Sequence, residues 1–126
     1  MKVFYGFLIP LSFFFSCNQQ QKDNKLINVS AEAQVNGEQL FKANCYQCHR
    51  AIENFAAPAL AGVEQKWEDK ATLYAFIRNS QDVIKRNEYA AALYQKWNKL
   101  YMQPFPDLSD KEIEAILAYC NAQRSQ

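Results

Sequence analysis

The residues best suited to chemistry in this chain lie together in the segment Cys45-Tyr46-Gln47-Cys48-His49. Its two cysteines stand about one helical turn apart, and an imidazole follows directly. The Cys-x-x-Cys-His pattern is typical of haem attachment, in which the two thiols form thioethers with the vinyl groups of one porphyrin and the histidine binds the iron. We therefore expect one covalent haem c, held by Cys45, Cys48 and His49, with His49 as an iron ligand.

Two other uses of these cysteines have to be weighed. A thioredoxin-like redox pair shares the Cys-x-x-Cys spacing, but it is expected in a βαβ context. A structural zinc site needs four ligands, which here could come only from Cys45, Cys48, His49 and Cys120. The adjacent Cys48 and His49 would fit one tetrahedron poorly. Haem attachment is the interpretation that we favour.

The second axial position of the iron needs a ligand other than histidine, because the chain contains one histidine. The candidates are Met102, a lysine, a terminal amine, or no ligand at all. Met102 is the only methionine left once a signal peptide carrying Met1 is removed. It precedes Pro104 and Pro106, whose fixed φ angles stiffen the loop. We predict Met102 as the sixth ligand, in preference to a role as adaptable core filler.

Helices must position these residues, because from residue 34 onward the apolar residues recur with a period near 3.6 and show no sustained period of 2. We expect helices over 36–45, around 73–77, over about 82–100, and from Ser109 onward. Ser109 and Glu112 form a capping box that marks the last of these. The predicted fold class is all-α, a small helical bundle wrapped around one haem. Candidates for the wall of the haem pocket are Phe55, Leu60, Trp67, Phe76, Tyr94, Trp97 and Phe105.

The N-terminal segment indicates export. One lysine, an apolar run and the small Ser16 before Cys17 form the layout of a signal peptide, here over residues 1–16. Cys17 in that place is similar to the lipidated cysteine of bacterial lipoproteins. The polar stretch 17–33 would then be a tether, and 34–126 the haem domain. We expect an exported, membrane-anchored lipoprotein that faces the periplasm or the cell exterior, with ordinary signal cleavage or an uncleaved anchor as alternatives.

Charge limits the possible partners. The chain has 14 Lys and Arg against 13 Asp and Glu, so it lacks the single-sign field that nucleic-acid binding needs, and no such partner is expected. A local set of basic residues could still rim the haem edge and meet an acidic protein, although such residues more often form a solvated helix face. The set is Lys85, Arg86, Lys96 and Lys99. We expect Cys120 to be buried and inert rather than disulfide-bonded to Cys17.

Residues 37–123 resemble class I (mitochondrial-type) cytochrome c in its bacterial monohaem form. The matching pieces are Gly37 and Phe41 before the haem motif, the run 58–62 after it, the run 102–106, and the run 108–110 leading into 116–119. The resemblance implies that the first and last helices cross, with Gly37 and Phe41 against Tyr119. It also implies that the carbonyl of Pro58 accepts the N–H of the haem-binding histidine. The 80–100 stretch is longer than in the smallest members of the family.

These expectations combine into one functional hypothesis. With His49 and Met102 both bound, the iron has no open position, so the chain would carry electrons by outer-sphere transfer and would not be an enzyme with a small-molecule substrate. The expected partners are redox proteins, such as a quinol-oxidising complex, a terminal oxidase or a dehydrogenase, together with the membrane through a lipid on Cys17. The alternatives are a fixed haem subunit of a larger respiratory oxidoreductase or, if Met102 is not a ligand, a five-coordinate peroxidase or gas sensor.

Overall fold

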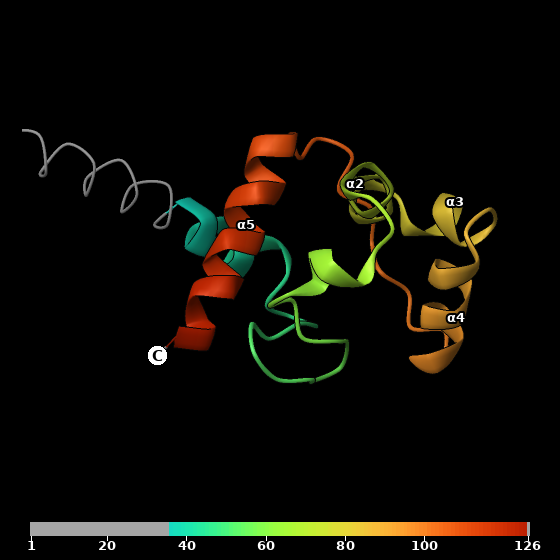
Figure 1. The fold of residues 1–126 in the computed structure, drawn as a ribbon, viewed down its shortest axis with the longest axis horizontal. Coiled ribbons are helices and arrows are strands. Elements are labelled where there is room, and N and C mark those ends of the chain that lie inside the picture. The colour runs from blue at the N-terminus through green and yellow to red at the C-terminus, as the bar shows by residue number, and fades with distance from the viewer. Residues whose placement is uncertain (1–35, 126) are drawn as a thin grey trace, which may run out of the picture.

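The computed structural model describes residues 36–125, and over that range the chain is helical without a β-strand, as predicted. The expected signal peptide (1–16) and the whole expected tether (17–33), including Cys17, lie outside the described part. The described elements are a helix over 36–44, η1 (Val63–Lys66), α2 (Lys70–Arg78), α3 (Ser80–Ile84), α4 (Glu88–Lys96), α5 (Asp110–Ala122) and η2 (Gln123–Ser125), as Figure 1 shows. Among them, none combines the length and the apolar character that a membrane span requires.

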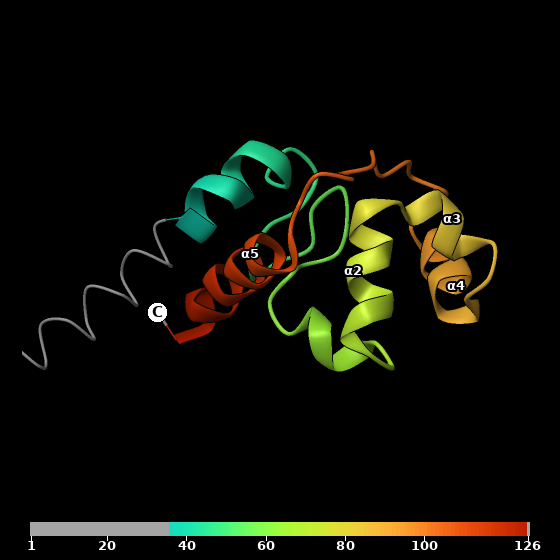
Figure 2. The ribbon, with the colours of Figure 1, turned by 90° about the horizontal axis from the view of Figure 1, so that it is seen from above.

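The first described helix (36–44) crosses α5, and Figure 2 shows the two side by side at one end of the molecule. Their backbones meet at Gly37, where a Cβ would collide with the carbonyl of Ala115 and would come within 3.2 Å of the Cβ of Tyr119. One turn later the rings of Phe41 and Tyr119 pack with centroids 5.6 Å apart. The helix crossing implied by the resemblance is therefore confirmed.

Helix α5 begins at the predicted capping box. The Ser109 hydroxyl accepts the backbone N–H of Glu112, and the Glu112 carboxylate accepts the backbone N–H of Ser109 at 2.8 Å. The apolar stripe of α5 is shared between two buried clusters, so this helix joins the two ends of the fold. One cluster contains Phe41, Ala61, Ile116 and Cys120, and the other contains Trp67, Leu73, Tyr74, Val83, Ala90, Ile113 and Leu117.

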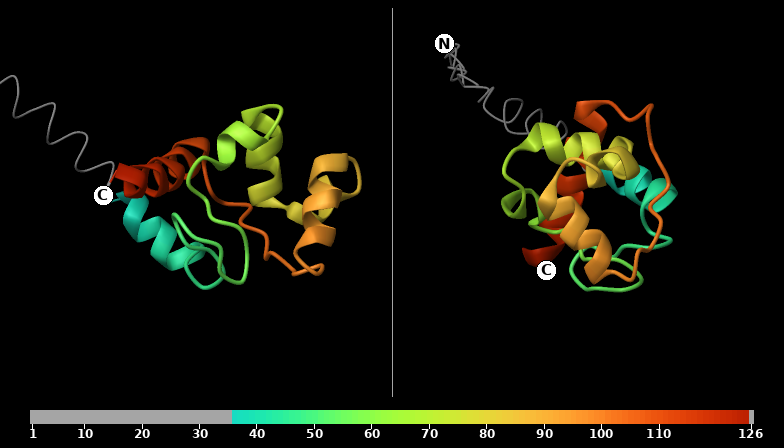
Figure 3. Two further views of the ribbon diagram at one scale, coloured as in Figure 1. Left: turned by 60° about the horizontal axis from the view of Figure 1, so that its bottom comes forward. Right: turned by 90° about the vertical axis from the view of Figure 1, so that its right-hand side faces the viewer.

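The single helix expected over about 82–100 is wrong, because the structure has two helices there, α3 and α4. Asn87 has an extended backbone, and its side-chain oxygen accepts the N–H of Ala90 at 2.9 Å, so it acts as an N-cap and starts a new helix. Helix α4 then stops at Lys96, because the chain takes a left-handed turn at Asn98 and Lys99, with φ of 54° and 58°. Figure 3 shows this turn leading into the extended segment that returns to α5.

Candidate functional site

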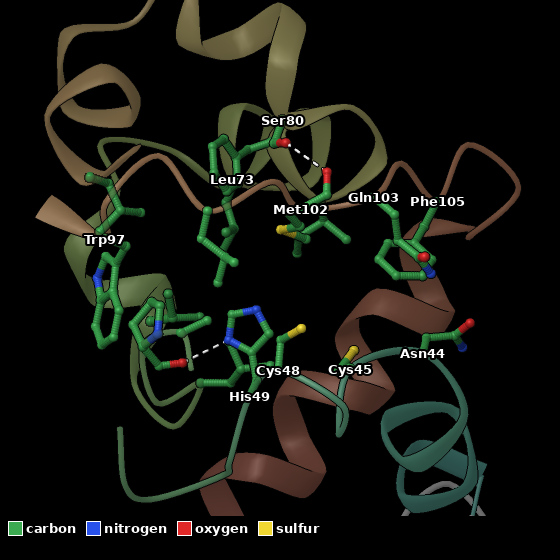
Figure 4. A pocket seen from close by; sticks show the side chains of 18 of the residues that line it. Asn44, Cys45, Cys48, His49, Leu73, Ser80, Trp97, Met102, Gln103 and Phe105 are labelled. Atoms are coloured by element: carbon green, nitrogen blue, oxygen red, sulfur yellow. Dashed lines mark hydrogen bonds between the residues drawn. The ribbon is translucent and has the colours of Figure 1, made fainter. Parts of the chain in front are cut away.

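One cavity of about 350 Å³ is bordered by the turn after the first helix, by α2 and α4, and by the extended segment before α5. Most of the side chains around it are apolar: Leu73 and Phe76 come from α2, and Ile113 and Leu117 come from α5. Its size and lining are those of a pocket for an apolar cofactor held by a few polar groups. Figure 4 shows the candidate site residues arranged around this space.

The haem-motif residues are brought together by a tight turn. The helix ends at residue 44, and the carbonyl of Cys45 accepts the N–H of Cys48 at 3.1 Å and that of His49 at 2.9 Å. The turn is anchored from the far side by the N–H of Ala57, which donates to the carbonyl of Cys48 at 3.0 Å. As a result Cys45, Cys48 and His49 all line the cavity, and in Figure 4 both sulfur atoms lie beside the imidazole at its floor.

The orientation of the His49 ring is set by Pro58. Its Nδ1 lies 2.7 Å from the carbonyl oxygen of Pro58. A carbonyl can only accept a hydrogen bond, so Nδ1 carries a proton, and in the neutral ring Nε2 then keeps its lone pair for a metal. Burial lowers the pKa of His49 below its usual value, with the bond to Pro58 opposing that change. The lowered pKa favours the neutral ring, and the bond to Pro58 favours the tautomer that can bind iron through Nε2.

Met102 lies across the cavity from His49. It belongs to the extended segment between α4 and α5 and is half-buried among the lining residues. Figure 4 shows its side chain and the His49 ring pointing into the cavity from opposite sides. Its backbone carbonyl accepts the hydroxyl of Ser80 at 3.2 Å. The five predicted site residues, Cys45, Cys48, His49, Pro58 and Met102, are therefore gathered around one cavity although they come from distant parts of the chain.

The predicted pocket wall needs one correction. Leu60, Trp67, Phe76, Tyr94, Trp97 and Phe105 line the cavity, but Phe55 does not. Its ring is 58% exposed and packs against the guanidinium of Arg50, which lies 3.9 Å from the ring centroid. Arg50 also lies 4.1 Å from the ring centroid of Tyr46, so these three side chains stack on the outer surface of the haem-motif loop.

Sequence reasoning missed Ser80, the polar side chain that is buried in the wall at 2% exposure. Within the 80–100 stretch it predicted Tyr94 and Trp97 for the wall, but not Ile84 or Leu93. The structure shows that Ile84 of α3, and Leu93, Tyr94 and Trp97 at α4, close one side of the cavity. The signals that could have indicated this are the Asn-Ser pair at 79–80, where α3 begins, and the cap at Asn87, which divides the expected helix.

The alternative metal site is not assembled. Among residues 36–125, no three His, Cys, Asp or Glu side chains are placed to hold one metal ion, so Cys120 does not join the haem-motif residues in a zinc site. Cys120 is a free thiol with 0% exposure at the helix crossing, and burial raises its pKa to about 12. It is thus buried in a form that resists ionisation.

The cavity wall also contains a buried hydrogen-bond donor that suits a haem. Trp67 lines it and is 7% exposed, yet its indole Nε1 has no hydrogen-bond partner within residues 36–125. A buried donor without a partner is costly, and a porphyrin carries carboxylates that can accept such a bond. Together with two thiols, one oriented imidazole and apolar walls, this donor fits a covalently attached haem.

The fold and the site define a class of protein, the c-type cytochromes: an all-α chain whose Cys-x-x-Cys-His turn opens on an apolar pocket. Residues 34–122 match the family model described as Cytochrome c. This chain therefore belongs to the cytochrome c family, whose members are haem proteins of electron transfer, and its cofactor is covalently bound haem c with iron. Among curated proteins, no significant match to this chain is found.

Solved structures agree with this assignment. The chain is similar to cytochrome c from Rhodothermus marinus, with a TM-score of 0.61 and 25% identity, over 96% of this chain and 92% of that chain. An engineered form of that cytochrome matches with a TM-score of 0.59 at the same identity. A further engineered form, bound to a carbene intermediate, matches with a TM-score of 0.58.

Proposed function

We propose that this protein is a carrier of single electrons between redox proteins, with His49 and Met102 as the two axial ligands of its iron. The observation that carries this proposal is the placement of the two side chains on opposite sides of one apolar cavity (Figure 4). When bound, the haem supplies reversible one-electron chemistry between Fe(III) and Fe(II). The chain would hold the iron through His49 and Met102, and its apolar side chains would keep water out of the pocket.

Each axial residue contributes differently. Pro58 keeps His49 in the tautomer with a free Nε2, which favours a permanent bond to iron. Met102 offers a soft thioether, which favours the ferrous state and raises the reduction potential. If His49 and Met102 both bind the iron, no substrate would reach the metal, and the chain contains no second histidine that could act as a distal acid–base group. This combination supports electron transfer over a peroxidase or a gas sensor.

Optical spectra of the haem-loaded protein test the proposal. Wild type is expected to show the sulfur-to-iron charge-transfer band when oxidised and to bind CO slowly or not at all when reduced. The Met102→Ala variant should lose the band and bind CO rapidly. The Met102→His variant, which restores a ligand of another kind, should again exclude CO and should have a lower potential. Rapid CO binding by wild type would overturn the assignment of Met102.

The proposal includes where the protein is located in the cell. A lipid on Cys17 and the polar tether 17–33 would hold the domain at the surface of the membrane, within reach of membrane-bound partners. Such partners would be a quinol-oxidising complex, a terminal oxidase or a dehydrogenase. Incorporation of labelled fatty acid into wild type and its loss in Cys17→Ser test the anchor. An unlabelled wild type in the soluble fraction would contradict it.

The partner surface that we propose lies where the extended segment borders the cavity. Leu100 and Tyr101 line the cavity and remain 42% and 60% exposed. Lys96 and Lys99 are exposed nearby in the chain. Apolar contact surrounded by positive charge suits a redox protein with an acidic docking face.

Small redox complexes can probe this surface without a known partner. Lys96→Glu combined with Lys99→Glu should slow oxidation by the anionic hexacyanoferrate(III) and speed oxidation by cationic tris(phenanthroline)cobalt(III). The control is Lys42→Glu combined with Lys111→Glu, which changes the net charge equally on other helices. Equal effects of the two pairs would show that only net charge matters.

A second candidate function is a fixed haem subunit of a larger oxidoreductase. The observation that favours it is the exposed apolar surface at the haem-motif loop, where Tyr46, Ile52 and Phe55 are 48%, 62% and 58% exposed. A fixed subunit would remain in a large complex after extraction with mild detergent, and Ile52→Ser with Phe55→Ser would release it. A shuttle would be extracted as a small protein in both forms.

A further inference from the structure

The segment that carries Met102 is held by the junction between α2 and α3. Helix α2 ends at Arg78, and α3 begins at Ser80, with Asn79 between them in a non-helical conformation of φ −155° and ψ 89°. Residues 100–105 in the facing segment belong to no helix. A segment without internal hydrogen bonds of its own depends on neighbouring elements to fix its position.

The break at Asn79 makes the first of these bonds possible. In a continuous helix the carbonyl of Arg78 would accept an N–H four residues later, but here it accepts the N–H of Phe105 at 3.0 Å. The same break turns Ser80 toward the segment. Its hydroxyl, on a residue that is 2% exposed, donates to the carbonyl of Met102 at 3.2 Å, as the dashed line in Figure 4 shows.

The Arg78 side chain fixes the far end of the segment. Its Nε donates to the carbonyl of Leu108 at 2.8 Å, and its Nη2 pairs with the carboxylate of Asp110 in the first turn of α5. The junction therefore contacts the segment at Met102, at Phe105 and at Leu108. These points lie before, within and after the proline-containing run 104–106.

We propose that Ser80 and Arg78 are positioning residues that keep the thioether of Met102 on the iron. The proposal rests on Met102 being the sixth ligand, as argued above. Ser80 acts at the Met102 carbonyl itself, so it limits how far the side chain can withdraw from the cavity. Arg78 limits movement of the rest of the segment toward solvent. Loss of either contact raises the population of a state in which the thioether has left the iron while the fold remains intact.

The test compares Ser80→Ala with a variant of similar stability cost at a distant place. Asp69→Ala serves this purpose, because Asp69 caps the N-terminal end of α2 through the N–H of Thr72 at 2.7 Å. Losing a helix cap and losing a buried hydrogen bond lower the free energy of unfolding by similar amounts. The readouts are the rate of CO binding to the reduced protein and the temperature at which the charge-transfer band of the oxidised protein disappears, each measured against global unfolding by circular dichroism.

We expect CO to bind Ser80→Ala about tenfold faster than wild type, since one hydrogen bond corresponds to about one such factor. The band should vanish well below the unfolding temperature. Asp69→Ala should lower the unfolding temperature while leaving CO binding as in wild type. Arg78→Lys keeps the positive charge but loses the donor that bonds to the Leu108 carbonyl. It should also speed CO binding, and it provides a second test if Ser80→Ala does not fold.

Two outcomes would overturn the inference. If the band in both Ser80→Ala and Arg78→Lys disappears only with global unfolding, and CO binds as slowly as in wild type, the two residues are merely structural and the inference is overturned. If wild type itself lacks the band and binds CO rapidly, the assignment of Met102 fails, and this inference fails with it. The wild-type spectrum thus separates the two failures.

Discussion

Gly37 and Ala115 are in direct backbone contact, so the first and last helices of the domain cross without a side chain between them. This contact lies next to the buried cluster that includes Phe41 and Cys120. Because the haem-attachment turn follows directly from the first helix, the crossing sets where both cysteines lie relative to α5.

Substitution of Gly37 tests this contact by the sign of its effect. Glycine to alanine ordinarily stabilises a helix by about 1 kcal/mol. At Gly37 the new Cβ meets the carbonyl of Ala115, so we expect Gly37→Ala to lower the free energy of unfolding by at least about 2 kcal/mol. The exposed Ala43 on the same helix is the control, and Ala43→Gly should cost about 1 kcal/mol. Stabilisation by Gly37→Ala in denaturant titrations would refute the close crossing.

The left-handed turn after α4 predicts a stabilising change. Lys99 has a φ of 58°, a conformation that costs a residue with a side chain about 1–2 kcal/mol relative to glycine. Part of that gain is lost to the greater freedom of glycine in the unfolded chain. We therefore expect Lys99→Gly to raise the free energy of unfolding by up to about 1 kcal/mol. Asn98→Gly should give less, because asparagine tolerates this conformation well. Thermal unfolding measures both variants. The expectation would be contradicted if Lys99→Gly stabilised the protein no more than Asn98→Gly, or destabilised it.

Tyr74 predicts a loss of stability at alkaline pH. It is 5% exposed, and burial, assisted by the nearby carboxylate of Glu114, raises its pKa to about 12. In the unfolded chain its pKa is about 10. Between these values the folded protein binds more protons than the unfolded one, so stability falls as the pH rises from about 10 to 12. The full effect is on the order of 2–3 kcal/mol.

Tyr74→Phe is the matched variant for this profile, since it keeps the ring and removes the proton. The difference in unfolding free energy between wild type and Tyr74→Phe should be constant below pH 10 and should shrink or reverse above it. Denaturant titrations over this pH range measure it. Parallel profiles for the two proteins would show that another group is responsible.

The cysteines predict a simple thiol count. Cys45 and Cys48 are consumed by the haem, while Cys120 is 0% exposed with a pKa raised to about 12. A soluble form of the haem-loaded domain without Cys17 should not react with iodoacetamide when folded, and it should react only at Cys120 when denatured. Peptide mass spectrometry identifies the modified residue. Labelling of Cys45 or Cys48 would show that haem attachment is incomplete.

Local patterns were sufficient for several features of the site and the fold. The haem-motif turn and the capping box at Ser109 each depend on residues within a few positions of one another, so their chemistry can be read along the chain. The prediction of one helix over 82–100 also came from a local pattern, and it was wrong. Apolar periodicity continues through this stretch, and a single cap at Asn87 outweighs it.

The amino-acid sequence by itself determined that this chain binds one haem covalently and folds from helices, because thioether chemistry and helical periodicity are both short-range properties. Only the tertiary structure decided which hydrogen bonds hold the site residues and which side chains line the cavity. Ser80 meets Met102 through a hydrogen bond to a backbone carbonyl, which any residue type carries. The matching bond between His49 and the Pro58 carbonyl was implied by the family resemblance and not by any local pattern. Phe55, in turn, lies outside the cavity, where its exposed ring packs against the guanidinium of Arg50. Such pairings depend on how distant segments pack, and no local pattern records them.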